Sequence, residues 1–198
     1  MDDRFTIDQL DASARSRACD KHRSINVEYN DWYEHVKHDA VVIGSHLGIA
    51  ITDLMFSGFY SQGDGASFVG RYSAEESAID RVKEHAPQDI ALHAIAERLT
   101  ATDTAIALIV PGRIITSITH SGHYYHSGCM RFEHDHEDNI DISECEELLD
   151  RRAQCLEDFA DWIYQQLEAE YDYQTEDAQV ISTLREITFV FDELGHTI

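Results

Sequence analysis

The sequence lacks the features that mark membrane, secreted and disulfide-bonded proteins. It has no run of 18 apolar residues, so we expect no membrane-spanning helix. The N-terminus, Met1-Asp2-Asp3-Arg4, has neither the basic nor the apolar region of a signal peptide. The four cysteines include no CxxC pair, which favours a reduced setting. These absences predict a cytoplasmic protein without a membrane partner.

Positive charge is also scarce. Lysine occurs only at Lys21, Lys37 and Lys83, and 15 basic residues stand against 38 acidic ones, a net charge of −23. Residues 133–198 hold 20 acidic and 3 basic residues, which concentrates a net charge of −17 in the last third. Such a field repels nucleic acid and attracts basic surfaces. The composition therefore argues against direct nucleic-acid binding and favours a basic protein partner.

The pattern of apolar residues predicts the fold class. A chain of 198 residues with 43% hydrophobic content fits one domain over 1–198. Glycine-rich Gln62–Gly65 predicts a hairpin turn between strands near 49–59 and 66–72, with bulges at Gly58 and Gly70. Residues 113–120 and 124–134 predict a second hairpin.

Helices account for most of the remaining chain. The apolar periodicity predicts an α+β fold, in which a small antiparallel sheet built from two hairpins packs against about five or six helices. The run 105–110 fits either helix or strand, and 189–191 fits a terminal strand. The predicted helices are 8–23, 30–47, 75–86, 88–99, 144–173 and 176–187.

The long helix after residue 144 carries two distinct faces. Its apolar stripe runs from Leu149 to Leu167 in steps of three and four, and an acidic face lies elsewhere on its circumference. Carboxylates at this spacing can take the place of phosphates on a basic partner, although an acidic face can also serve solubility or a salt-rich cytoplasm alone. The predicted partner-binding residues are Glu133, Asp135, Glu137, Asp138, Asp141, Asp150, Glu157, Asp161, Glu168 and Asp172.

Three other patterns favour catalysis only weakly. His134 and His136 share one face of a predicted strand, as metal ligands can, but no spacing fixes a third ligand. Cys129 follows His126 closely but lacks the local signature of a nucleophile. The glycine turn lacks the Lys-Ser/Thr of a P-loop. We therefore expect no cofactor, and structural roles for these groups.

Several short motifs resemble those of a known family. Phe56-Ser57-Gly58-Phe59 and Ser61-Gln62-Gly63-Asp64-Gly65-Ala66 are similar to the signature of small proteins from proteobacteria and their phages. Most of these have no assigned function, and some are labelled antitoxin-like. The likeness extends to 31–34, 86–89, 124–129 and 161–164. The resemblance implies a phage or mobile-element setting and supplies no catalytic residues.

The combined prediction is a non-enzymatic acidic protein from a phage or mobile element. It inhibits a basic host protein that binds nucleic acid, such as a CRISPR or restriction effector, by imitating the nucleic acid. One alternative is an antitoxin that masks a basic toxin. Another is a metal-dependent hydrolase that uses the cluster His120–His136. The sequence is also compatible with a homodimer.

Overall fold

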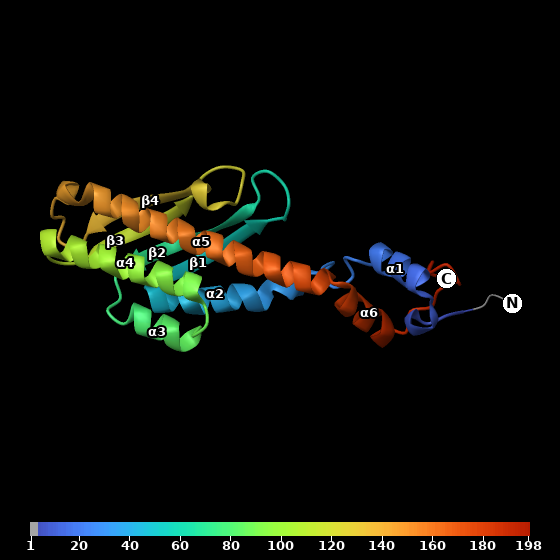
Figure 1. Ribbon diagram of the computed structural model, residues 1–198. Helices are drawn as coiled ribbons and strands as arrows, with labels where there is room; N and C mark the ends of the chain where they lie inside the picture. The colour runs from blue at the N-terminus through green and yellow to red at the C-terminus, as the bar shows by residue number, and fades with distance from the viewer. Residues whose placement is uncertain (1–3) are drawn as a thin grey trace. The chain divides into compact units, whose positions relative to one another are not determined.

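The computed structural model describes residues 4–198, which form two compact units (Figure 1). The larger unit is Val36–Gln166, and the smaller one combines the chain up to His35 with Leu167–Ile198. The single domain over 1–198 stays a prediction. The start of the chain, where no signal peptide is expected, lies partly outside the described residues.

A four-stranded antiparallel sheet in the order β1-β2-β3-β4 organises the larger unit. It confirms the predicted α+β class and both hairpins. The strands are β1 (Ile49–Ser57), β2 (Gly65–Ser73), β3 (Ile114–His120) and β4 (Met130–His136).

The two hairpins differ in how closely they match the expected boundaries. The first has its turn at the glycine-rich segment, where Gly63 adopts a φ of 90° that favours glycine. The second begins its return strand at Met130, later than expected, because Ser127–Cys129 forms the 3-10 turn η3. Gly122, with a φ of 125°, lies in the same connection. Residues 124–129 are therefore a loop, not a strand.

The two predicted bulges have different outcomes. The register of β1 against β2 shifts between Ile51 and Asp53, away from Gly58, where no shift forms. This shift lies opposite Gly70, because Ile51 pairs with Gly70 and Asp53 with Val69, so the extra residue is in β1 and not in β2. A Cβ at Gly70 would lie 2.2 Å from the carbonyl oxygen of Ala50, so the glycine allows the close approach of β1 at the shift.

Helices cover one face of this sheet (Figure 1). They are α2 (Glu34–Leu47), α3 (Ala78–His85), α4 (Ile90–Ile109) and α5 (Glu146–Thr175), with the 3-10 turn η4 (Ser143–Cys145) before α5. The α5 ring of Phe159 packs edge-on against Phe68 of β2, with centroids 5.9 Å apart. Burial alternates along β3, so Ile114, Thr116 and Ile118 face the helices.

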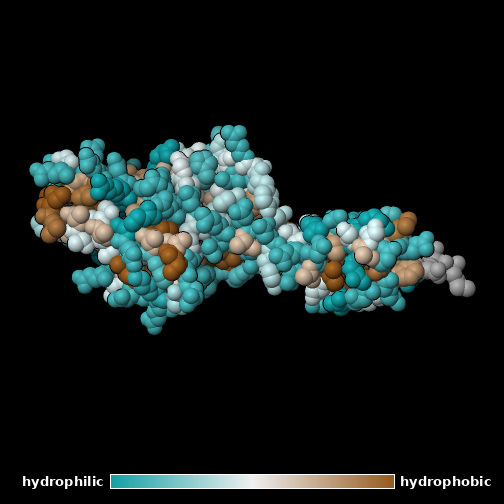
Figure 2. Space-filling model, in the orientation of Figure 1, coloured by the Kyte–Doolittle hydropathy of each residue, from teal (hydrophilic) through white to brown (hydrophobic). Residues whose placement is uncertain are grey.

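The run 105–110, which fits either a helix or a strand in the sequence, forms the end of helix α4. The predicted helix over 88–99 continues to Ile109, because Ile106 joins the core beside Ile114 and Leu149. Beyond this contact the helix end is apolar and uncovered, with Leu108 84% exposed. Figure 2 shows the corresponding hydrophobic patch at that end of the larger unit.

The smaller unit has its own core, made by α1 (Ala12–Lys21), α6 (Asp177–Glu186) and the 3-10 turn η1 (Ile7–Gln9). The predicted helix over 8–23 is shorter because Asp11 caps α1 by accepting a hydrogen bond from the Ala14 N–H. A further 3-10 turn, η2 (Asn30–Tyr33), precedes α2. Around 189–191 the structure has only isolated bridges, among them Phe5 with Phe191.

No helix within residues 4–198 is long and apolar enough to cross a membrane.

Candidate partner-binding surface

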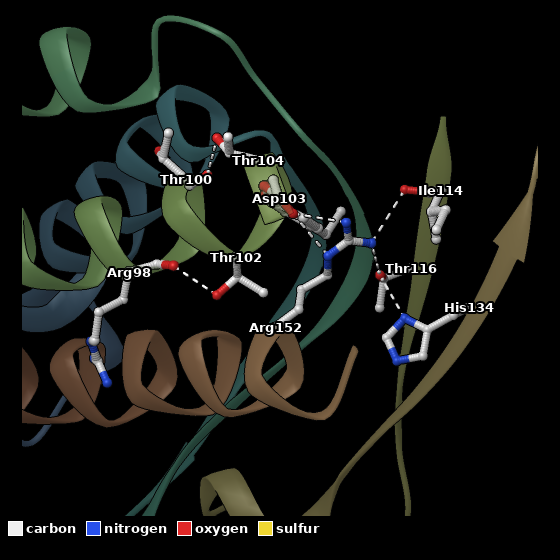
Figure 3. Close-up of polar contacts among 10 residues, drawn as sticks. Arg98, Thr100, Thr102, Asp103, Thr104, Ile114, Thr116, His134 and Arg152 are labelled. Carbon is white, nitrogen blue, oxygen red and sulfur yellow. Dashed lines mark hydrogen bonds and ion pairs between the residues drawn. The ribbon is translucent and has the colours of Figure 1, made fainter. Parts of the chain in front are cut away.

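A buried arginine connects α5 with α4, two of the helices that cover the sheet (Figure 3). Arg152 of α5 is 2% exposed, and its Nε and Nη2 atoms lie 3.0 and 2.7 Å from Oδ1 of Asp103 on α4. The hydroxyl of Tyr72 on β2 donates to the other carboxylate oxygen. Burial raises the pKa of Tyr72, and the Asp103 carboxylate raises it further. The phenol therefore stays protonated and keeps donating.

The same arginine reaches β3 and, through it, β4. Its Nη1 donates to the Ile114 carbonyl at 3.5 Å and to the Thr116 hydroxyl at 3.4 Å. The Thr116 oxygen lies 2.9 Å from Nδ1 of His134 (Figure 3). The guanidinium only donates, so the Thr116 hydroxyl accepts from Arg152 while it shares a second hydrogen bond with Nδ1 of His134.

Burial lowers the pKa of His134, and the Arg152 charge lowers it further. The imidazole is therefore neutral near pH 7, and it adds no positive charge to its surroundings.

A cavity of about 510 Å³ lies next to His134, between β4 and the first turns of α5. Half of its lining residues are apolar, among them Met130 and Phe132 on β4 and Leu149 and Ala153 on α5. Polar groups complete the lining: Arg131, His134, Ser143, Glu146 and Asp150, with Ile142 beside them.

Of the predicted acidic residues, only Asp150 lines this cavity. Glu133 and Asp135 are exposed on β4 and alternate with His134, which lines the cavity, so they lie on the opposite face of the sheet. The predicted acidic surface is therefore divided between two faces. The acids before α5 partly serve the backbone, because Glu137 accepts from the Arg113 N–H and Asp141 from the Ser143 N–H. Asp138 is exposed.

The acidic face of α5 begins in the larger unit and continues in the smaller one. Asp150 and Asp161 are exposed, and Glu157 is half-buried. Burial raises the pKa of Glu157, and the carboxylates of Asp161 and Asp158 raise it further. Glu168 and Asp172 belong to the smaller unit. The structure thus places five predicted residues on one helix, three of them within one unit.

Three of these carboxylates make no ion pair in the described part of the chain. Asp158 pairs with Arg98 at 2.6 Å, but none of Asp150, Glu157 and Asp161 makes an ion pair within residues 4–198. The charge of Arg131 partly opposes the rise in the pKa of Glu157. Like charges spaced three or four residues apart repel one another along a helix, and a cation from outside the chain would relieve this repulsion.

The histidines are engaged in hydrogen bonds that fix the sheet. His136 donates from Nε2 to the Pro111 carbonyl and accepts at Nδ1 from the Asp138 N–H, at 2.9 and 3.0 Å. His120 donates from Nε2 to the Tyr124 carbonyl. Within residues 4–198, no three His, Cys, Asp or Glu side chains gather so that they could hold a metal ion. The hydrolase alternative gains no support from this geometry.

The two glycine-rich loops meet at one end of the sheet. His126 Nε2 lies 3.6 Å from Cys129 Sγ, and Cys129 is 7% exposed. The backbone of His126 packs against Gly65, and the ring of Tyr124 packs against Gly63. The segments 61–66 and 124–129, which resemble one family signature, are thus neighbours in space, and Cys129 is a buried member of their packing.

The fold and this surface define an α+β protein in which an acidic helix borders a cavity on a helix-covered sheet. The sequence model of a family described as a domain of unknown function, DUF8835, matches residues 32–177. The chain therefore belongs to this family. A search of the curated proteins found no match. A search of the solved structures likewise found none.

Proposed function

We propose that this protein is a non-enzymatic inhibitor that occupies the basic surface of a nucleic-acid-binding protein. One observation carries the proposal: Asp150, Glu157 and Asp161 lie on one helical face, and none of them makes an ion pair within residues 4–198. A groove built for phosphates presents Arg and Lys, with which carboxylates form charge-assisted hydrogen bonds.

The α5 backbone makes this surface rigid. The helix is fixed to the sheet by Arg152 and by the ring contact of Phe159 with Phe68, so its carboxylates are held in a defined series. Neighbouring positions three or four residues apart are about 5–6 Å apart at Cβ, which is similar to, though shorter than, phosphate spacing along a strand. Little conformational entropy is then lost on binding.

In the phage or mobile-element setting that the family resemblance implies, the target is a host defence protein in the bacterial cytoplasm. A CRISPR or restriction effector has the required basic groove. An antitoxin that masks a basic toxin would use the same carboxylates in the same way.

The experiment is capture of DNA-binding proteins from a bacterial lysate on the immobilised chain, repeated over a salt series. The test variant is Asp150→Lys, Glu157→Lys, Asp161→Lys. The control is Glu76→Lys, Asp80→Lys, Glu84→Lys, which makes the same net charge change at exposed positions on and beside α3.

We expect wild type and control to capture the same proteins, and the test variant to lose them. Truncating a buried charge pair costs about 2–5 kcal/mol, and a pair at the rim much less. Equal capture by all three proteins at every salt concentration would contradict the proposal and would mean that the acidity serves only solubility.

A further inference from the structure

We propose that the cavity between β4 and α5 receives an arginine side chain of the basic partner. This inference rests on the proposed function and names the group that the partner inserts. The cavity volume, about 510 Å³, lies within the range of ligand pockets, about 300–1,000 Å³.

The apolar walls match the stem of such a side chain. Met130 and Leu149 are 2% and 6% exposed and line the cavity together with Ala153. The carbon chain of an arginine or a lysine buries well along such a surface while its charged head stays near water. The walls alone do not distinguish the two residues.

The charged lining selects a cation. Glu146 and Asp150 both line the cavity from α5, four residues apart, and neither makes an ion pair within residues 4–198. A cation between them would relieve the repulsion between two carboxylates at this spacing.

The cavity's own arginine does not fill this role. Arg131 directs Nη1 at the carbonyl oxygens of Gly128 and Met130, at 3.1 and 2.7 Å. His134, whose Nδ1 is held by Thr116, is neutral and does not repel an incoming cation. Arg131 therefore lies at the cavity wall but makes no ion pair with Glu146 or Asp150 within residues 4–198.

Two features favour a guanidinium over an ammonium. Its planar fork can bond a carboxylate through two N–H groups, which a lysine cannot do. The ring of Phe132 lines the same cavity, and a guanidinium stacks on aromatic faces more readily than an ammonium does.

The test is an NMR titration of the full chain with N-acetyl-arginine amide, followed at the methyl groups of Met130, Leu149 and Ala153. We expect saturable shifts confined to these groups. The uncharged isostere N-acetyl-citrulline amide should bind about tenfold more weakly, because it forms no charge-assisted bond. The lysine analogue should also bind more weakly.

Variants separate the cavity from the general acidity. Glu146→Gln and Asp150→Asn should each weaken arginine binding about tenfold, whereas Glu147→Gln, at an exposed neighbour outside the cavity, should not. Ala153→Leu fills the cavity without changing the charge and should abolish the shifts. Unsaturable shifts over the whole acidic surface, or equal binding by Glu147→Gln and Asp150→Asn, would overturn the proposal.

The outcomes distinguish this inference from the proposed function. If wild type does not bind the arginine amide while the α5 charge reversal still abolishes capture, only the cavity inference fails. If arginine binds as expected while the reversal leaves capture unchanged, only the proposed function fails.

Discussion

Replacement of Arg152 by methionine should destabilise the larger unit far more than the same change at Arg151. The two residues are adjacent on α5, but Arg152 is 2% exposed and Arg151 is exposed. Methionine preserves most of the side-chain stem, so the change removes chiefly the charge and its hydrogen bonds. Arg151→Met is therefore a matched control.

The magnitude follows from what the substitution leaves behind. The side chain of Asp103 is 12% exposed and would retain only the hydrogen bond from Tyr72, while Thr116 and the Ile114 carbonyl would lose a donor. Breaking a buried ion pair on one side costs about 3–5 kcal/mol. Exposed substitutions away from such contacts usually change stability by less than about 0.5 kcal/mol.

The assay is urea unfolding of wild type and both variants, which yields the free energy of unfolding. The loss in Arg152→Met should shrink at acidic pH. Burial raises the pKa of Asp103, and removing the guanidinium, which opposes this shift, raises it further. The penalty is then fully present above the raised folded pKa of the carboxyl, shrinks as pH falls through that pKa, and is gone below the unfolded pKa.

A second variant tests the origin of the loss. Adding Asp103→Asn to Arg152→Met removes the buried charge and should recover part of the stability. Equal unfolding free energies for Arg152→Met and Arg151→Met would refute the reasoning, and so would a loss that is the same at neutral and acidic pH.

Two further predictions concern the sheet. Gly65→Val should lower the melting temperature, because a Cβ at Gly65 would lie 2.6 Å from Cα of His126. Gly58→Ala should not lower it comparably, since its Cβ would lie 3.6 Å from the nearest atom, in Asp64. Equal melting temperatures would refute the account of the loop packing. Wild-type stability should fall as pH drops below about 6.5. Below this pH, His134 binds a proton in the unfolded chain but stays neutral in the folded protein, where its pKa is lowered. Unfolding at pH values on both sides of that point should show a smaller fall in His134→Gln than in the exposed-site control His123→Gln, and equal falls would contradict the assignment.

Much of the fold follows from local patterns in the sequence. The apolar stripe from Leu149 to Leu167 predicts α5, and the glycine turn predicts the first hairpin, because both signals depend on neighbours in the chain. The extension of the predicted helix 88–99 to Ile109 was left open, and the late start of β4 was not predicted, for different reasons. The apolar run after residue 105 fits either state until its partners are known, and Tyr124–Cys129 has aromatic residues typical of strands.

Sequence reasoning missed the buried ion pair, although a signal for it is present. Arg152 lies three residues after Leu149 and four before Leu156, and Asp103 lies four after Leu99 and three before Ile106. Each charged residue thus lies within the apolar stripe of its own helix. One such position with a positive charge and one with a negative charge indicate a buried ion pair. The cavity had no such signal, because it depends on the packing of α5 against β4.

The predicted surface was partly accessible from the sequence. Helical spacing places Asp150, Glu157 and Asp161 on one face, and all three lie together in the structure. The division of α5 between two units was not predictable from its periodicity, which continues through Leu167 without interruption. That these residues bind a partner stays a prediction.

The central claim is that the carboxylates of α5 occupy the place of nucleic acid on a basic partner. The most direct measurement takes a captured DNA-binding protein, loads it with labelled DNA and titrates in this protein while following DNA release by fluorescence anisotropy. The account predicts that wild type and the α3-region control Glu76→Lys, Asp80→Lys, Glu84→Lys displace the DNA completely, and that Asp150→Lys, Glu157→Lys, Asp161→Lys does not. A stable complex that holds both the DNA and this protein would contradict it.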